Sequence, residues 1–261
     1  MQDKIFGRVL VLTLCIQLLF AVWPQLDLIV ARWFLLADGT FWLAGNAVAE
    51  DMRHLVWFVS LAFASVAAAM LLCTAVLGGR AVTPWRFWAF VTTLYVLGPG
   101  LLANLVLKAH WGRARPADVV EFGGALQFTP PFEMTDQCLR NCSFVSGEAA
   151  AAAVLAIVLG MVLLPGLQRV PRMLIGLVLA MMFIWVAGQR MASGRHFLSD
   201  VVFAGLFMLL MARWLYGLLQ VRGATGAGLT AGMRADAALA LRPAFLGVTS
   251  FITGVKARFT G

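Results

Sequence analysis

Residues 190–200 read Arg190-Met-Ala-Ser-Gly-Arg-His-Phe-Leu-Ser-Asp200 and separate two long apolar stretches, Met173–Gly188 and Val201–Val221. This short polar segment holds two arginines, a histidine and an aspartate. Ionisable side chains beside stretches of membrane-spanning length are costly unless they are paired or hydrated, so they are candidates for a functional site. An ordinary polar loop between two membrane helices is the alternative interpretation of the same residues.

The whole chain has the composition of an integral membrane protein. Of its 261 residues, 62% are hydrophobic and only 12% are charged, about half the charged share of a soluble domain. Several apolar runs approach or exceed the roughly 18 residues that indicate a transmembrane helix. We therefore predict an all-α integral membrane protein, a bundle of six transmembrane helices around Val9–Trp23, Leu55–Leu77, Phe87–Leu107, Ala149–Leu164, Met173–Gly188 and Val201–Val221.

Two patterns predict irregular structure next to these helices. The segment Leu26–Leu35 alternates loosely between polar and apolar residues and is too short to span, so we expect an amphipathic segment on the outer membrane interface. Residues 97–100 read Leu-Gly-Pro-Gly and predict a kink, because proline removes a backbone hydrogen bond. Asn104 follows one turn later and is expected to face protein rather than lipid.

The distribution of charge predicts the orientation. If successive loops alternate sides, one side receives 12 of the 20 lysines and arginines but only 2 of the 12 carboxylates, which leaves 8 cations and 10 carboxylates for the other. The positive-inside rule then places both termini in the cytoplasm and residues 190–200 on the outer face. The first apolar run follows Lys4 and Arg8 as in a signal peptide, but no small-x-small cleavage site follows it, so we expect a retained anchor.

The chain divides into two predicted parts. Residues 1–222 form the six-helix membrane domain, and residues 223–261 form a cytoplasmic tail that begins with a Gly/Ala/Thr-rich linker. For the tail, an interfacial helix and a disordered end both remain open. Cys138 and Cys142 share one outward segment, 108–146, and are expected to form a disulfide if that side is an oxidising compartment.

Three polar segments lie at the outer ends of the last four predicted helices and are expected to converge. Ser146 has the features of a helix N-cap, with a carboxylate in the first turn and an alanine run behind it. A helix N-terminus combined with cations makes an anion site, most often for phosphate. A histidine held by a carboxylate serves as a nucleophile or general base. The converging cations are Lys108, Arg113, Arg115, Arg190 and Arg195, and the histidine and carboxylate are His196 and Asp200.

These residues resemble the three-part signature of the type 2 phosphatidic acid phosphatase superfamily, which includes membrane lipid phosphatases and, more distantly, vanadium haloperoxidases. The matching residues, within the core 108–200, are Lys108-x6-Arg115-Pro116, Ser146-Gly147 and Arg190-x5-His196-x3-Asp200. Gln189 stands where the family commonly has serine. Residues 138–148 resemble, more narrowly, a branch that includes lipid A 4′-phosphatase-like proteins.

The resemblance implies a role for each matching residue. The family histidine, here His196, attacks phosphorus and forms a phosphohistidine, while the carboxylate, here Asp200, orients and polarises it. The phosphate oxygens are held by the family's cations and by backbone N–H groups, here at Lys108, Arg115, Arg190, Ser146 and Gly147. Water then hydrolyses the intermediate without a metal or another cofactor, through positioning and charge neutralisation.

The second motif departs from the family pattern. Its usual Pro-Ser-Gly-His provides a histidine that protonates the leaving alkoxide, but this chain has Val145-Ser-Gly-Glu148. A helix N-terminus and nearby cations favour an ionised carboxylate, whereas a bound phosphate dianion favours its protonation. Three assignments remain open: Glu148 is the acid in the substrate complex, His110 substitutes for it, or Glu148 contacts polar groups of the substrate. We favour the first assignment.

The sequence therefore predicts a bacterial inner-membrane lipid phosphatase with its site facing the periplasm. The expected substrate is a lipid phosphomonoester or the terminal phosphate of a lipid diphosphate, presented by the bilayer, and no nucleic-acid partner is expected. A lipid-to-lipid phosphotransferase shares the phosphohistidine step and remains open. A degenerate inactive relative and a non-catalytic binder or transporter of anionic lipids are further alternatives. The sequence names neither the lipid nor the oligomeric state.

Overall fold

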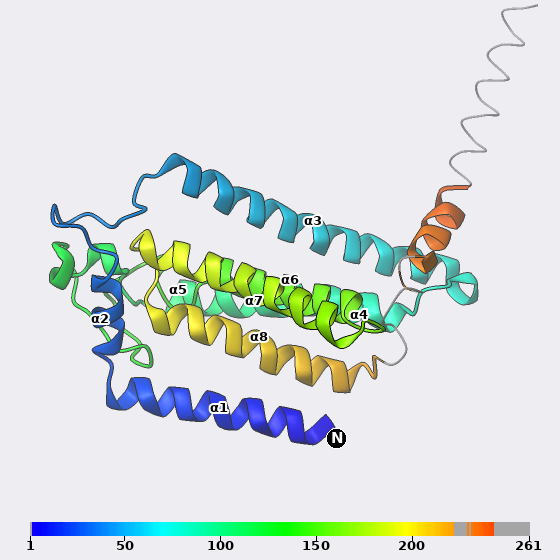
Figure 1. The fold of residues 1–261 in the computed structure, drawn as a ribbon, viewed down its shortest axis with the longest axis horizontal. Helices are drawn as coiled ribbons and strands as arrows, with labels where there is room; N and C mark the ends of the chain where they lie inside the picture. Colours follow the sequence, from blue (N-terminus) through cyan, green and yellow to red (C-terminus); the bar gives the residue numbers. More distant parts are fainter. Residues whose placement is uncertain (1, 222–228, 230, 243–261) are drawn as a thin grey trace, which may run out of the picture.

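The computed structural model describes residues 2–221, 229 and 231–242, and Figure 1 shows their arrangement. Long helices run alongside one another, and the short helix α2 crosses them at one end (Figure 1). The longer elements are α1 (Gln2–Val22), α2 (Leu26–Arg32), α3 (Ala47–Leu77), α4 (Trp85–Tyr95), η2 (Val96–Leu107), α6 (Gly147–Leu163), α7 (Arg169–Ala192) and α8 (Leu198–Leu218). Elements of one turn are η1 (Gly78–Arg80), α5 (Lys108–His110), η3 (Pro116–Asp118) and η4 (Val120–Phe122).

Each of the six predicted apolar runs lies in a helix, and the chain is a multi-pass membrane protein. Four helical segments of the described residues are long and apolar enough to span a bilayer: Ala47–Arg80, Trp85–His110, Arg169–Ala192 and Leu198–Leu218. Phe6–Val22 and Leu26–Arg32 form a fifth candidate span with an 83° bend, and α6 is a shorter apolar helix. In the apolar windows of α3 and α7 only 17% and 11% of the residues are buried, which suits helices that face lipid.

The interior of the bundle is built around α6. Its first turns carry the alanine run 149–153, and Ala149, Ala150 and Ala152 are completely buried. This helix contacts α7, α8, η2 and α3. Small side chains let helix backbones approach closely, and this close packing stabilises helix pairs in a membrane. Because α6, which also contacts α4, lies among its neighbours, the residues at its N-terminus are surrounded by the ends of several helices.

Pro99 interrupts the regular α-helix in the third apolar run, where the sequence predicts a kink. Residues Val96–Leu107 form the wide π-helical turns of η2, and Pro99 lies inside them. The Asn104 side-chain amide donates a hydrogen bond of 2.6 Å to the Pro99 carbonyl oxygen. Asn104 thus faces protein, as expected. It provides a hydrogen-bond donor for the carbonyl of Pro99, the residue that interrupts the regular pattern of helical hydrogen bonds.

The amphipathic segment after the first apolar run is helical over Leu26–Arg32, but it does more than rest on the membrane interface. Its Asp27 is fully buried and accepts hydrogen bonds from the Ser199 backbone N–H (2.8 Å) and the Ser199 hydroxyl (2.5 Å). The segment is therefore docked onto the N-terminus of α8. Docking, and not interfacial lipid contact alone, explains why α2 turns sharply away from α1 (Figure 1).

Part of the predicted tail packs against the bundle at the opposite end. Residues 231–242 are helical, and the Asp236 carboxylate accepts hydrogen bonds from the backbone N–H groups of Val82 (2.6 Å) and Thr83 (2.9 Å). These contacts tie the tail to the turn between α3 and α4. The second hydrophobic part of the tail, Phe245–Val255, lies outside the described residues.

Candidate active site

The three predicted polar segments meet at one end of the bundle. Lys108 follows η2, Ser146 is the N-cap of α6, Arg190 lies in the last turn of α7, and His196 lies in the loop before α8. The Ser146 hydroxyl accepts a hydrogen bond of 3.2 Å from the Ala149 N–H, which confirms the predicted cap. Convergence follows from the up-and-down connectivity, because α6 and α8 begin where η2 and α7 end.

His196 is fixed in one orientation within this end. It is 1% exposed, and its Nδ1 donates a hydrogen bond of 2.7 Å to the Ser143 carbonyl oxygen. Burial lowers the pKa of His196 to about 4. The ring is therefore neutral at pH 7, with its proton on Nδ1 and a lone pair on Nε2. Nε2 has no hydrogen-bond partner among the described residues, so a nucleophilic nitrogen is held in place and left free.

Asp200 makes its hydrogen bonds with residues around His196 and not with the histidine ring itself. Its Oδ2 accepts hydrogen bonds from the Ser143 hydroxyl (2.5 Å) and the Phe197 N–H (2.7 Å), and its Oδ1 accepts one from Arg113 (2.6 Å). Because α8 begins at Leu198, the segment between His196 and Asp200 is not a continuous helix. Oδ2 lies 3.8 Å from His196 Nδ1, too far for a hydrogen bond. Asp200 thus orients Ser143, whose carbonyl oxygen accepts the hydrogen bond from His196 Nδ1.

Arg113 does not join the predicted set of outer cations. It is completely buried, and its guanidinium donates to Asp27 (2.8 Å), Asp200 (2.6 Å) and the Ser199 hydroxyl (2.8 Å). Burial lowers the pKa of Arg113, but the charges of Asp200 and Asp27 outweigh this and raise it. We call this group the Arg113 network; its members are Asp27, Arg113, Ser199 and Asp200. Its polar groups bind one another, so the prediction that Arg113 lies at the anion site is wrong.

Glu148 lies at the centre of the remaining charges. Its Oε2 is 3.6 Å from Lys108 Nζ and 3.9 Å from His196 Nε2, and its Oε1 is 3.8 Å from Arg190. None of these distances is short enough for a hydrogen bond. Among the described residues, Glu148 Oε2, His196 Nε2 and two guanidinium nitrogens of Arg190 are buried without hydrogen-bond partners. We call this group the Glu148 cluster; its members are Lys108, Glu148, Arg190 and His196.

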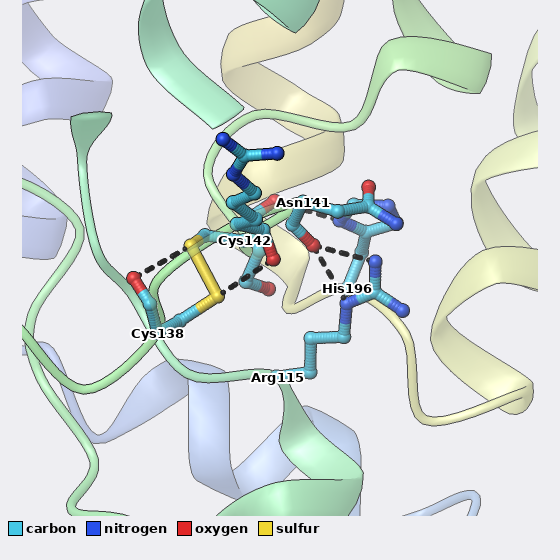
Figure 2. Close-up of a disulfide and its surroundings, with 7 residues drawn as sticks. Arg115, Cys138, Asn141, Cys142 and His196 are labelled. Atoms are coloured by element: carbon cyan, nitrogen blue, oxygen red, sulfur yellow. Dashed lines mark hydrogen bonds between the residues drawn. A yellow bond between two sulfur atoms is a disulfide. The ribbon is translucent and has the colours of Figure 1, made fainter. Parts of the chain in front are cut away.

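Arg115 approaches the histidine loop from the other side, beside a disulfide. Cys138 and Cys142 are joined, as predicted, and within the loop that they close the Asn141 carbonyl accepts a hydrogen bond of 2.6 Å from Arg115. Figure 2 shows Arg115, the disulfide loop and His196 together. Burial and the neighbouring positive charge of Arg195 lower the pKa of Arg115. Arg195 itself is exposed, so it is the most solvated of the predicted cations.

Two glycines allow the turns that deliver these residues. Gly112 adopts φ +75°, and a Cβ there would lie 1.5 Å from the Thr135 carbonyl oxygen. Gly194 adopts φ +66°, and a Cβ there would lie 2.6 Å from the ring of Phe41. Residues with a side chain rarely adopt this conformation, and here they would also collide with their neighbours. The two turns send Arg113 inwards and bring His196 under the N-terminus of α6.

Comparison with known proteins gives this arrangement a family. The family model of the PAP2 superfamily matches residues 87–224, more than half of the chain. The chain belongs to the PAP2 superfamily. The resemblance that the three motifs indicated is thereby confirmed, and the matched range contains every member of the Glu148 cluster.

Curated relatives agree with this PAP2 assignment. A lipid A 4′-phosphatase of Francisella tularensis subsp. novicida (strain U112) is 31% identical over 224 residues, which cover 82% of this chain and 96% of the relative. A lipid A 4′-phosphatase of Rhizobium leguminosarum is 42% identical over 116 residues, 44% of this chain and 48% of the relative. No solved structure matches the chain significantly. The predicted enzyme class, a phosphatase acting on lipid phosphate, is confirmed.

The structure adds Arg53 and Glu50 to the PAP2 motif residues. Both lie in the first two turns of α3, and Arg53 is 3.7 Å from Glu148 Oε1. Our sequence analysis missed them because it began the second apolar run at Leu55, which left residues 50–53 outside the predicted helix. Asn46, which caps α3 by accepting a hydrogen bond of 3.0 Å from the Ala49 N–H, is a signal that could have extended the helix back to them.

A cavity of about 310 Å³ opens beside the Glu148 cluster. His110 was one of the three open assignments for the acid, but it does not line this cavity. His54, the other histidine outside the third motif, does. His110 is exposed in α5. The lining residues are Arg53, His54, Trp57, Phe58, Asn104, Lys108, Gly147 and Glu148.

Proposed function

We propose that this PAP2 protein hydrolyses a phosphate monoester of a lipid, with the 4′-phosphate of lipid A as the first substrate to test. The observation that carries the proposal is the Glu148 cluster, in which a histidine nitrogen and two guanidinium nitrogens are buried without hydrogen-bond partners among the described residues, next to one carboxylate. Buried polar groups without partners are rare in folded proteins, and here they match the charge and the donors that a phosphate requires. The names of the relatives supply the lipid.

The proposed first step is attack by His196 Nε2 on phosphorus. A nitrogen–phosphorus bond forms, and the bond from phosphorus to the lipid oxygen breaks. The Ser143 carbonyl oxygen stabilises the positive charge that develops on the imidazole through the proton on Nδ1. Lys108, Arg115 and Arg190 neutralise the phosphate oxygens, and the N-terminus of α6 at Gly147 adds the positive end of the helix dipole. The predicted contribution of the Ser146 backbone N–H is not part of this proposal, because that group already donates a hydrogen bond of 3.2 Å to the Asp200 carbonyl oxygen. Water then cleaves the nitrogen–phosphorus bond and releases inorganic phosphate.

Glu148 is proposed to deliver the proton to the leaving lipid oxygen. It is the carboxylate within 3.9 Å of His196 Nε2, whereas His110 is exposed and does not line the cavity. The neighbouring cations favour an ionised Glu148 in the free enzyme. A phosphate monoester with a second pKa of about 6 is able to bring the missing proton itself. We propose that the monoanion binds, shares its proton with Glu148, and that Glu148 passes it to the leaving oxygen.

An apolar groove supports a lipid substrate. It lies between α3 and η2 and has a volume of about 450 Å³. Trp57 and Asn104 line both this groove and the cavity beside the Glu148 cluster. A lipid with its phosphate at His196 therefore has an adjoining surface for part of an acyl chain, reachable from the bilayer.

We propose six membrane spans, both termini in the cytoplasm, and a site on the periplasmic face of the bacterial inner membrane. Within this scheme residues 1–222 remain the membrane domain and 223–261 a cytoplasmic tail. The charge distribution supports the orientation, and so does the Cys138–Cys142 disulfide near His196, because disulfides persist in oxidising compartments. Reporter fusions after the proposed cytoplasmic turns test this topology. Periplasmic signals from those turns would reverse it.

The function is tested by phosphate release in detergent from lipid A, phosphatidate, phosphatidylglycerophosphate and undecaprenyl diphosphate. Wild-type protein should release phosphate fastest from lipid A, with loss of the 4′-phosphate seen by mass spectrometry. The His196→Ala variant serves as the matched inactive protein. Release from none of the four lipids by folded wild-type protein would refute the proposal.

A further inference from the structure

Arg53 approaches Glu148 at Oε1, the carboxylate oxygen that Arg190 also approaches, and Glu50 lies 3.9 Å from Arg190. The Arg53 Nε donates a hydrogen bond of 2.6 Å to Glu50, one turn earlier in α3. The same guanidinium is 3.7 Å from Glu148 Oε1. The Arg53 side chain is only 22% exposed, and it lines the cavity beside the Glu148 cluster. The hydrogen bond to Glu50 therefore holds the Arg53 guanidinium in a direction that brings it close to the Glu148 carboxylate.

The charges around Glu148 explain why such a residue is needed. Glu148 stands where the PAP2 signature usually has a histidine, so this chain places a carboxylate beside the phosphate position. Two negative groups in one low-dielectric site repel each other strongly. Without substrate, Lys108 and Arg190 lie near the Glu148 carboxylate, at 3.6 and 3.8 Å. When a phosphate binds Lys108 and Arg190, the Glu148 carboxylate requires a third cation to compensate its charge.

Arg53 is suitably placed to be that cation. It is about as far from Glu148 as Lys108 and Arg190 are, and it approaches from α3, whereas Lys108 and Arg190 belong to η2–α5 and α7. A small movement of the carboxylate towards α3 exchanges one charge partner for another. The carboxylate stays next to the leaving oxygen during this movement. Arg53 also lies outside the family match at 87–224.

We propose that Arg53 is a positioning residue that acts through Glu148. It takes over the Glu148 carboxylate when Lys108 and Arg190 bind the substrate phosphate, and it stabilises the negative charge that returns to Glu148 when the proton leaves. Glu50 holds Arg53 in the required direction. The inference rests on the proposed function, because it assumes that a phosphate binds within the Glu148 cluster.

A double-mutant cycle on the full-length protein in detergent tests the proposal. The variants are Arg53→Met, Glu148→Gln and the two combined, and the readout is the concentration of inorganic phosphate that half-saturates the thermal stabilisation of each protein. In the wild-type background, Arg53→Met should weaken phosphate binding about tenfold, because an uncompensated Glu148 keeps competing for Lys108 and Arg190. In the Glu148→Gln background the same change should matter less than about twofold. Equal weakening in both backgrounds, or none in either, would overturn the proposal.

Two further comparisons keep the test decisive if Arg53→Met folds poorly. Arg53→Lys retains the charge and should recover most of the phosphate affinity; a folded Arg53→Lys protein as weak as Arg53→Met would count against charge compensation. Glu50→Gln should weaken phosphate binding, whereas Asp51→Asn, which changes the neighbouring exposed carboxylate, should not. Equal effects of these two carboxylate variants would remove the positioning role.

Activity separates this inference from the proposed function. In lipid-phosphate hydrolysis, Arg53→Met should raise KM and lower kcat, while Arg32→Met on the exposed side of α2 leaves both unchanged. If wild-type protein hydrolyses no lipid phosphate, or if His196→Ala retains full activity, the proposed function fails. If those two proteins behave as expected and the cycle shows no coupling, only the role of Arg53 fails.

Discussion

The Arg113 network and the Glu148 cluster lie at the same end of the bundle and use similar residues in opposite ways. In the Arg113 network, two carboxylates bind one guanidinium at 2.6 and 2.8 Å, and its side chains are completely buried. In the Glu148 cluster, one carboxylate lies 3.6 Å from Lys108, 3.8 Å from Arg190 and 3.9 Å from the neutral His196. The charged groups of the Arg113 network are hydrogen-bonded to one another. In the Glu148 cluster, several buried polar atoms have no hydrogen-bond partner among the described residues.

This difference separates scaffold from site. Breaking a buried ion pair that is fully hydrogen-bonded leaves an uncompensated charge and destabilises the fold. Removing a group that has no partner in the free protein leaves nothing unpaired behind, so its loss is felt when a ligand binds. Arg190 begins the third motif and Arg113 lies within the first. Their hydrogen bonds distinguish the arginine that supports the fold, Arg113, from the arginine of the candidate site, Arg190. The predictions below test that distinction.

The largest effect is expected for His196→Ala. The variant lacks the nucleophile, so phosphate release should fall by about 10⁴-fold or more. Its thermal midpoint in detergent should fall by less than that of a variant that leaves a buried charge unpaired, because the lost Nδ1 hydrogen bond leaves only a neutral carbonyl without its partner. A phosphorylated wild-type protein, trapped by acid quenching and absent from His196→Ala, would identify the intermediate. Substantial turnover by the alanine variant would rule out the phosphohistidine route.

The next prediction contrasts two arginines directly. Arg190→Met should lower phosphate release about 10²- to 10³-fold, the usual loss when a group that stabilises transition-state charge is removed, with little change in thermal midpoint. Arg113→Met should destabilise the protein by about 3–5 kcal/mol, because Asp27 and Asp200 are left buried without their cation. For a chain of this size that is a fall of about 10 °C in the thermal midpoint. If both variants lose stability equally, the distinction between scaffold and site is wrong.

The third prediction concerns pH. His196 must be neutral to attack, and burial lowers its pKa to about 4, so protonation should abolish kcat/KM only as the pH falls through about 4. Above about pH 6 the substrate loses the proton that we assign to the leaving group, so kcat/KM should fall again. The profile, measured on folded protein at each pH, should therefore be bell-shaped with its maximum near pH 5. An acid limb near the ordinary histidine value would mean that the ring is hydrated in the working enzyme.

The smallest effect is expected for the disulfide. Replacing Cys138 and Cys142 by serine frees the loop whose Asn141 carbonyl holds Arg115 and whose neighbour Ser143 holds His196. Slight misplacement of these two groups should raise KM and lower kcat/KM by less than about tenfold. Cys15→Ser and Cys73→Ser, in α1 and α3, provide matched controls. A loss as large as that of Arg190→Met would make the loop part of the phosphate site rather than its support.

Much of the fold was predictable because it depends on local composition. Apolar runs of spanning length must form helices in a membrane, where each backbone polar group needs a partner. The interruption of the helix at Pro99 and the N-cap at Ser146 follow from single residues with strong conformational preferences. The docking of α2 was not predictable in this way, because Asp27 in a short amphipathic segment has the same pattern whether it faces water or the buried Arg113.

The candidate site was predictable only in part. The order of Lys108, Ser146, Arg190 and His196 along the chain, with an alternating topology, was enough to bring their helix ends together. Arg53 was missed because it carries no motif and lies in a turn of α3 that hydropathy does not distinguish from a loop. The sequence predicted direct contact between Asp200 and His196. In the structure Ser143 links them, because its hydroxyl binds Asp200 and its carbonyl oxygen binds His196, and sequence spacing contains no information about this link.

The order of residues was enough to predict the helices, the family and the end of the bundle at which the polar segments meet, because apolar length and motif order are local properties. Which charges are already paired became visible only in the folded protein. Pairing depends on whether residues far apart in the chain come within hydrogen-bond distance, as Asp27 and Arg113 do at 2.8 Å. For this protein that criterion separates the charges that hold the bundle together from the residues that we propose bind a phosphate, which are Lys108, Glu148, Arg190 and His196.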